Sequence, residues 1–215
     1  MQKKNKKIFI IGLDGAIGWA VQKAVTPNID KVLAEGAVTY SATTVFPSAI
    51  FEAWGAMFHG VGPEKHKLDG SHLCPEDFDF PSFMKVAKEA YPDIKSASFC
   101  CWEPININII EQSINCQMVS MPDPQLAVDA EQYIRKDESL IILLSDHGGV
   151  GTSHGSNAPD CMNIFWGCSG PGVKKGIELK EPLNIMDTSA VILYALGLPA
   201  PSNWDARIPN GLFSF

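Results

Sequence analysis

The sequence predicts an α/β protein with a doubly wound, mainly parallel sheet and helices on both faces. Along almost all of its 215 residues, short apolar runs of strand length alternate with segments whose apolar residues recur at helical spacing. Two of the predicted strands, which begin at Lys7 and Leu140, are each followed by an acidic residue. That arrangement is typical of strands that carry functional side chains to the carboxyl edge of a sheet. No repeat, low-complexity segment or linker divides the chain, so we expect a single domain over residues 1–215.

The N-terminal part supplies the first strands and helices of this pattern. Residues 26–36 predict a helix with Thr26 at its N-cap, Pro27 at its first position and Gly36 at its end. Gly60 likewise ends a predicted helix that begins at Ser48. In chain order, the elements expected before residue 121 are a strand at 7–13, the helix at 26–36, a strand at 37–43, helices at 48–58 and 82–90, a buried strand at 94–101, a short helix or turn at 105–112 and a strand at 117–120.

The C-terminal part continues the alternation. A helical pattern at 124–136 leads directly into the apolar strand that begins at Leu140. A second buried strand is expected at 163–168, where Gly170-Pro171-Gly172 stops it, and a closing helix at 186–196. The remaining tail, 199–215, is rich in Pro, Asn and Trp, and we expect it to wrap the surface.

Composition excludes several classes of function. The formal net charge of −7 gives no basic surface for nucleic acid. The six cysteines show no CxxC spacing, and a disulfide scaffold is not expected in a domain this large, so small buried thiols are favoured. No apolar run reaches membrane-spanning length, and the apolar run at 8–13 is too short for a signal peptide. We therefore expect a soluble, cytoplasmic protein with no nucleic-acid or membrane partner.

The strongest chemical signal is the stretch from Leu140 to Gly155. Its apolar run stops at Asp146-His147-Gly148-Gly149, and His154 follows seven residues after His147. Asp14 ends the first predicted strand in the same way. Carboxylate and imidazole ligands suit Zn²⁺ or another divalent transition metal such as Mn²⁺. The simpler alternative is that Asp146 and His147 are ordinary turn residues.

Several short motifs follow one another along the chain: Leu13-Asp14-Gly15, Thr26-Pro27-Asn28-Ile29-Asp30, Phe46-Pro47-Ser48, Gly62-Pro63-Glu64-Lys65-His66, Asp146-His147-Gly148-Gly149, His154-Gly155 and Gly170-Pro171-Gly172. Their order resembles the alkaline phosphatase superfamily, and within it the type I phosphodiesterase and nucleotide pyrophosphatase branch. The resemblance covers residues 7–70 and 139–206.

The resemblance implies a metal-dependent phosphoric ester hydrolase and assigns roles to individual residues. Asp14, Asp146 and His147 match the ligands of one metal, and His154 matches a ligand of a second. The implied cofactor is Zn²⁺ or another divalent metal such as Mn²⁺, at one site at most. The implied partner is a small phosphoester or a nucleotide. Neither the substrate-binding residues nor the oligomeric state can be assigned from the sequence.

Two departures from the family pattern put hydrolysis in doubt. The position of the family's Ser or Thr nucleophile is occupied by Ile50, which has no group that could attack phosphorus. Ser48 is a weak substitute, and the simpler interpretation makes it a helix N-cap. In addition, the family supplies an Asp and a His from the middle of the chain, and these have no counterpart here. The family's central metal-ligand segment is therefore missing from this chain between about residues 120 and 140. His72 with Asp69 is a nearby stand-in, although an exposed polar turn explains that pair more simply.

Three hypotheses follow. The chain could be a phosphoester hydrolase that uses metal-activated water instead of a side-chain nucleophile. It could be a catalytically inactive member of the superfamily, with one divalent-metal site and a binding or regulatory role. It could also be a deletion fragment of a longer hydrolase. The joint loss of a nucleophile and two ligands favours the second and third.

Overall fold

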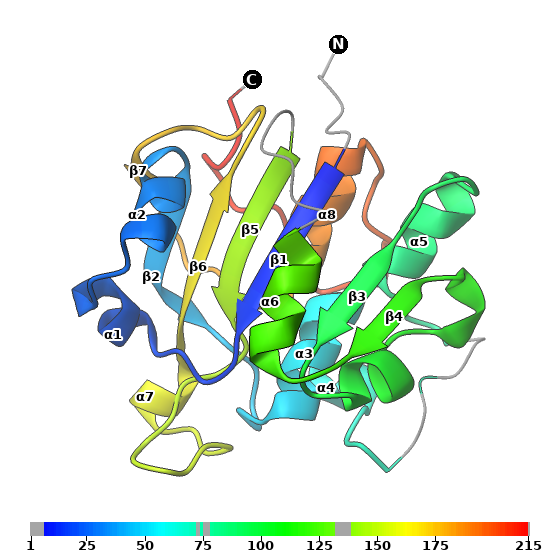
Figure 1. Cartoon of the computed structure of the whole chain (residues 1–215), viewed down its shortest axis with the longest axis horizontal. Coiled ribbons are helices and arrows are strands. Elements are labelled where there is room, and N and C mark those ends of the chain that lie inside the picture. The colour runs from blue at the N-terminus through cyan, green and yellow to red at the C-terminus, as the bar shows by residue number, and fades with distance from the viewer. Residues whose placement is uncertain (1–6, 72–73, 75–77, 132–138, 215) are drawn as a thin grey trace.

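A computed structural model describes residues 7–71, 74, 78–131 and 139–214. Its centre is a five-stranded sheet within these residues, shown in Figure 1. The strands lie in the order β1 (Lys7–Leu13), β5 (Ser139–Ser145), β6 (Asn163–Ser169), β2 (Ala37–Thr43) and β7 (Ile177–Glu178). The predicted α/β class and most predicted strand positions are thereby confirmed.

Strand direction departs from a wholly parallel sheet at β6. β1 pairs with β5 and β2 pairs with β7 in parallel, whereas β6 is antiparallel to both β5 and β2. The link from β5 to β6 holds only the short helix α7 (Pro159–Met162), so the chain turns back beside β5. A return to the parallel direction needs a longer crossover, usually one that contains a full helix.

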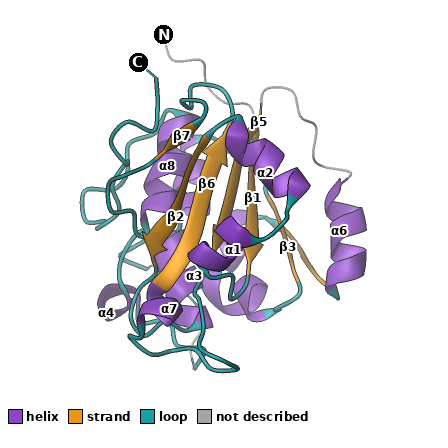
Figure 2. Ribbon diagram, turned by 90° about the vertical axis from the view of Figure 1, so that its left-hand side faces the viewer, coloured by secondary structure: helices purple, strands orange, loops and turns teal. Residues whose placement is uncertain are grey.

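Helices cover both faces of the sheet, as Figure 2 shows. On one face lie α1 (Gly18–Lys23) and α2 (Pro27–Ala34), where Leu33 packs with Leu143 and Phe165 of the sheet. The other face carries α3 (Ile50–His59) and α8 (Asp187–Leu196), with α5 (Phe83–Ala90) packed against α8. This second face holds the larger hydrophobic core.

A small second sheet lies beside the main one. It pairs β3 (Ala97–Cys100) with β4 (Gln117–Ser120) in parallel, and the π-helix η1 (Ile105–Ile109) and the 3₁₀ turn η2 (Gln112–Ile114) connect them. Helix α6 (Asp123–Glu131) follows and contacts β3. The expectation of a buried strand at 94–101 is wrong, because β3 is shorter and only Cys100 within it is buried. An apolar run alone does not show which sheet a strand joins.

The remaining differences concern short elements and the tail. The sequence prediction missed α1, α7, β7 and the one-turn helix α4 (Pro63–His66), which are too short to show a clear period. The tail does more than wrap the surface, because Trp204, Leu212 and Phe213 are buried in the larger core. Among the described residues, no helix is long and apolar enough to cross a membrane.

Candidate metal centre

The carboxyl ends of β1 and β5 bring Asp14 and Asp146 together. The two strands are paired in register, with Leu13 opposite Ser145, so that each acidic residue directly follows a paired position. The Asp146 Oδ1 atom accepts hydrogen bonds from the backbone N–H groups of Gly15, at 3.0 Å, and His147, at 2.8 Å. These bonds fix the Asp146 carboxylate against the turn that carries Asp14.

Ser145 ties the same two turns together a second time. Its Oγ accepts a hydrogen bond from the backbone N–H of Ala16 and donates one to the carbonyl of His147, both at 2.8 Å. The buried serine at the end of an apolar strand therefore positions the turn at residues 146–149, which is called the ligand turn below. Its polar side chain was visible in the sequence, but its partners depend on the strand pairing.

The His147 ring presents a lone pair to both carboxylates. Its Nδ1 lies 2.7 Å from the carbonyl oxygen of Gly148, and because a carbonyl only accepts, Nδ1 must carry the proton. The other ring nitrogen, Nε2, lies 3.5 Å from Asp146 Oδ2 and 3.6 Å from Asp14 Oδ1. A hydrogen bond from the second nitrogen to a backbone carbonyl is how metal-binding histidines are usually oriented.

Two of these facing atoms are buried without partners. Asp146 Oδ2 and His147 Nε2 make no hydrogen bond within the described chain, although both residues are almost wholly buried. Burial of polar atoms without compensation is costly, and a cation between these lone pairs would remove that cost. The ligand atoms of Asp14, Asp146 and His147 all lie within 4.8 Å of one another. The three residues therefore fit a divalent metal.

Electrostatics agree with this fit. The pKa of Asp146 is raised to about 6. Burial is the largest cause and the neighbouring Asp14 carboxylate acts in the same direction, while His147 and two backbone N–H groups act in the opposite direction. The Asp14 side chain is about half exposed, so the cluster reaches solvent on that side. A buried carboxylate beside a second carboxylate is an unfavourable arrangement that a cation would stabilise.

The Gly148 backbone locks the ligand turn against α7. Its N–H donates to the carbonyl of Cys161 at 2.9 Å. A Cβ atom at position 148 would lie 1.9 Å from the carbonyl oxygen of Asp160, which no real contact allows. Glycine is therefore required here for close backbone approach, and this explains the Asp-His-Gly order seen in the sequence.

His154 lies beside this cluster. Its ring stacks on that of His147, with centroids 4.2 Å apart and planes at 17°. It is exposed and does not belong to the group of ligand atoms formed by Asp14, Asp146 and His147. Its role as a ligand of a second metal therefore stays a prediction.

The start of α3 carries no free hydroxyl at the expected nucleophile position. Ile50 is the first residue of the helix, and the N-cap is Ala49. The interpretation of Ser48 as an N-cap is therefore wrong. Ser48 is buried, and its hydroxyl donates to the carbonyl of Ser156 at 2.7 Å, which ties α3 to the loop that carries His154.

The remaining candidates cannot be placed in the site. His72 lies outside the described residues, as do residues 132–138 of the segment where the family's central ligands would be expected. Asp69 accepts a hydrogen bond from the backbone N–H of Ser71 within its own turn, at 2.9 Å. That local bond is typical of a polar turn.

Comparison with solved structures places the fold among phosphodiesterases and sulfatases. An inactive murine ectonucleotide pyrophosphatase/phosphodiesterase 5 in complex with AMP has a TM-score of 0.69 and 12% identity, covering 97% of this chain and 100% of that chain. A 2-O glycosaminoglycan sulfatase has a TM-score of 0.70 and 11% identity, covering 95% and 73%. A protein bound to its substrate D-glucosamine-2-N,6-O-disulfate has a TM-score of 0.72 and 11% identity, covering 99% and 81%.

The alkaline phosphatase-like fold predicted from the motifs is thus confirmed. No protein-family model matches the chain, and no curated protein matches its sequence. At such low identity the likeness to these structures describes the fold alone.

Proposed function

We propose that this chain, which has an alkaline phosphatase-like fold, binds one divalent metal ion through Asp14, Asp146 and His147 and uses it to hold a small phosphate or sulfate ester. The observation that carries the proposal is a pair of buried atoms, Asp146 Oδ2 and His147 Nε2, which face each other at 3.5 Å and have no hydrogen-bond partner in the described part of the chain. Zn²⁺ or Mn²⁺ suits two carboxylates and an imidazole.

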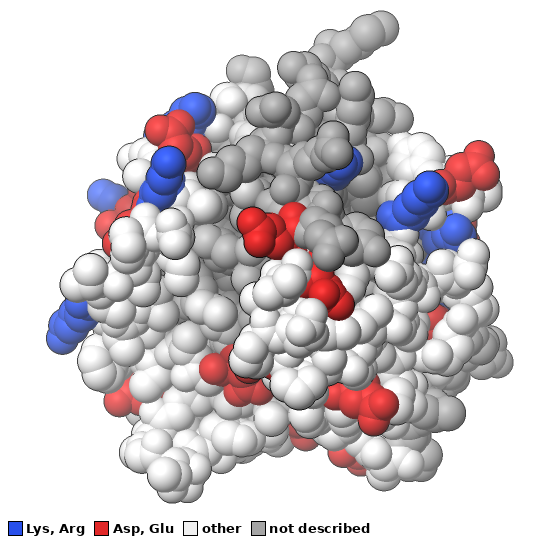
Figure 3. Space-filling model, viewed as in Figure 1, with Lys and Arg blue, Asp and Glu red and all other residues white. Residues whose placement is uncertain are grey.

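Surface charge makes the metal necessary for an anionic ligand. In Figure 3, the part of this face nearest the carboxyl end of β1 shows acidic side chains and, among the described residues, no lysine or arginine, while the opposite edge and the sides carry both charges. Asp14 belongs to this carboxyl edge of the sheet. An ester anion would be repelled there unless a cation offset the carboxylates. When bound, the metal would supply a Lewis acid for one ester oxygen.

The start of α3 favours binding over hydrolysis through a covalent intermediate. Ile50 offers no nucleophile, and the Ser48 hydroxyl is committed to the carbonyl of Ser156. We therefore infer a binding or regulatory role for the site. Hydrolysis of a phosphoric ester by water is the second candidate, and the complete Asp14, Asp146 and His147 set is what favours it.

The first experiment measures ester binding with and without metal. Protein freed of metal by chelation is titrated calorimetrically with AMP and, separately, with inorganic sulfate, before and after one equivalent of Mn²⁺ is added. We expect binding only with metal, and its loss in Asp146→Asn, which keeps the side-chain shape. His154→Ala is the matched control and should retain one bound metal. Equal binding with and without metal would overturn the proposal.

The second experiment separates binding from hydrolysis. Turnover of bis(p-nitrophenyl) phosphate and p-nitrophenyl phosphate is followed with excess metal. We expect no turnover above that of Asp146→Asn. Metal-stimulated turnover that Asp146→Asn abolishes would instead establish the hydrolase and reject the binding role.

A further inference from the structure

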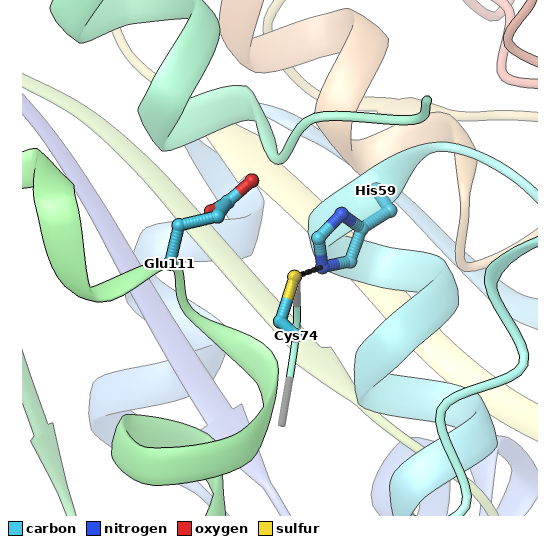
Figure 4. A group of neighbouring side chains, drawn as sticks. All are labelled: His59, Cys74 and Glu111. Atoms are coloured by element: carbon cyan, nitrogen blue, oxygen red, sulfur yellow. Dashed lines mark hydrogen bonds between the residues drawn. The ribbon is translucent and has the colours of Figure 1, made fainter. Parts of the chain in front are cut away.

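A second group of potential ligands lies on the face of the main sheet that carries α3. Figure 4 shows that His59, Cys74 and Glu111 converge from three segments. His59 is the last residue of α3, Cys74 lies between α4 and α5, and Glu111 lies between η1 and η2. All three are buried, and one ligand atom of each lies within 4.8 Å of the other two. They stand 15 and 37 residues apart in the sequence, which shows no motif.

The His59 ring cannot satisfy both of its neighbours with a single proton. Its Nδ1 lies 2.7 Å from the carbonyl oxygen of Phe80, and its Nε2 lies 3.0 Å from that of Ile109. Both carbonyls only accept hydrogen bonds, whereas a neutral imidazole has one N–H. With the proton on Nδ1, where the contact is shorter, the Nε2 lone pair faces the Ile109 oxygen. Burial lowers the pKa of His59 despite the nearby Glu111 carboxylate, and this favours the neutral ring.

The other two side chains add further electron-rich atoms at this point. Cys74 Sγ lies 3.9 Å from His59 Nε2. The Glu111 carboxylate is fixed by Ser82, whose backbone N–H and hydroxyl donate to its two oxygens at 2.7 and 2.6 Å. None of the ion pairs found among the described residues includes Glu111. Four electron-rich groups therefore meet around one point: a buried imidazole nitrogen, a sulfur, a carboxylate and a carbonyl oxygen. A cation there would offset the negative charge and the lone pairs of all four groups.

We propose that His59, Cys74 and Glu111 form a structural zinc site, with the Ile109 carbonyl as a fourth oxygen donor. Zn²⁺ accepts nitrogen, thiolate and carboxylate ligands together, and structural zinc sites are closed to solvent. The Cys74 thiol gives up its proton to the solvent when the Zn–S bond forms. The ion would join the end of α3 to the segment before α5, which carries Cys74, and to the turn after η1, which carries Glu111. Ser82 extends this link to α5, because its Oγ also accepts a hydrogen bond from the backbone N–H of Lys85 in the first turn of that helix.

Cobalt substitution distinguishes this site from the one at Asp14, which contains no sulfur. Metal-free protein is titrated with Co²⁺ under reducing conditions, and the near-ultraviolet absorbance is followed. We expect a sulfur-to-cobalt charge-transfer band that saturates by two equivalents in the wild-type chain, because the site at Asp14 also takes Co²⁺, and that disappears when excess Zn²⁺ is added. The band should be retained in Asp146→Asn, so this result does not depend on the function proposed above.

Cysteine variants identify the sulfur that binds. Cys74→Ser should lose the band, whereas Cys101→Ser, at an exposed cysteine, should keep it. The titration of wild-type protein tests the proposal even if Cys74→Ser does not fold, because it needs no variant. The proposal is overturned if wild-type protein shows no band, or if Cys74→Ser retains it. It is also overturned if ¹⁵N NMR shows His59 doubly protonated in the presence of excess Zn²⁺, because the site would then be a buried imidazolium and carboxylate pair.

Discussion

Asp146 Oδ2 and His147 Nε2 face each other across 3.5 Å, and neither has a hydrogen-bond partner among the residues that the structure describes. Two buried lone pairs in this position raise the free energy of the metal-free protein. Hydrogen bonds to the other polar atoms of the same two side chains fix their orientation. Asp146 Oδ1 accepts from the backbone N–H groups of Gly15 and His147, and His147 Nδ1 donates to the Gly148 carbonyl. The stability of the metal-free protein therefore depends on the protonation state of Asp146.

The metal-free protein should lose stability as pH rises from about 4 to about 6. Burial raises the pKa of Asp146 from 3.8 to about 6, so in this interval the folded protein keeps a proton that the unfolded chain releases. The free energy of unfolding then falls with rising pH, by at most about 3 kcal/mol for a shift of this size. Denaturant unfolding at several pH values, with chelator present, measures the effect.

Asp146→Asn isolates that contribution from all other titrating groups. An amide oxygen can still accept from Gly15 and His147, and the amide nitrogen can donate to Nε2 of the imidazole. The variant should therefore be more stable than wild type above pH 6 without metal, by about 1–3 kcal/mol, and nearly equal near pH 4. Unfolding curves that stay parallel for the two proteins across this range would contradict the assigned role of Asp146.

Gly148→Ala should destabilise the fold and displace the ligand turn. The added Cβ would meet the Asp160 carbonyl oxygen at 1.9 Å, and overpacking costs about 1–3 kcal/mol, with the upper end expected against rigid backbone. Gly149→Ala is the matched control, because its Cβ would lie 3.2 Å from the nearest atom, the Ser153 carbonyl oxygen. Thermal unfolding and metal titration of both variants test the difference. Similar losses of stability and metal binding in the two variants would show that the close approach of residue 148 to the Asp160 carbonyl is unimportant.

Ile50→Thr should not create a phosphoesterase. It returns a hydroxyl to the start of α3, but the family's Asp and His from the middle of the chain still have no counterpart in the sequence. We expect no turnover of bis(p-nitrophenyl) phosphate above that of the unchanged chain when Zn²⁺ or Mn²⁺ is in excess. A clear metal-dependent gain would show that only the nucleophile is lacking.

Ser48→Ala should affect stability alone. It removes the hydrogen bond to the Ser156 carbonyl, and the lost bond with its buried acceptor costs about 1–2 kcal/mol. Ester binding and metal content should stay unchanged, as measured by calorimetry and elemental analysis. Loss of either with the fold intact would assign Ser48 to the site itself.

The sequence predicted those parts of the site that lie close together along the chain or end a strand. Asp146 and His147 could be recognised because they follow an apolar strand, and Asp14 because it ends another. That the three converge depends on the parallel pairing of β1 with β5 in register, which the α/β alternation made the expected arrangement. The antiparallel course of β6 could not be predicted, because it depends on a connection that contains only one short helix.

Contacts between distant segments account for what the sequence did not predict. The helical pattern after Ser48 predicts an N-cap there, yet the Ser48 hydroxyl donates to the carbonyl of Ser156. His59, Cys74 and Glu111 carry no spacing that indicates a shared site. They meet only because α3, the chain before α5 and the turn after η1 pack together.

The most direct test of the central claim is a calorimetric titration of metal-free protein with Mn²⁺, which prefers oxygen and nitrogen ligands to thiolate. We predict one equivalent bound by the wild-type chain and by His154→Ala, and none by Asp146→Asn. Binding of the same equivalent by Asp146→Asn, or no binding by the wild-type chain, would contradict a metal centre at Asp14, Asp146 and His147.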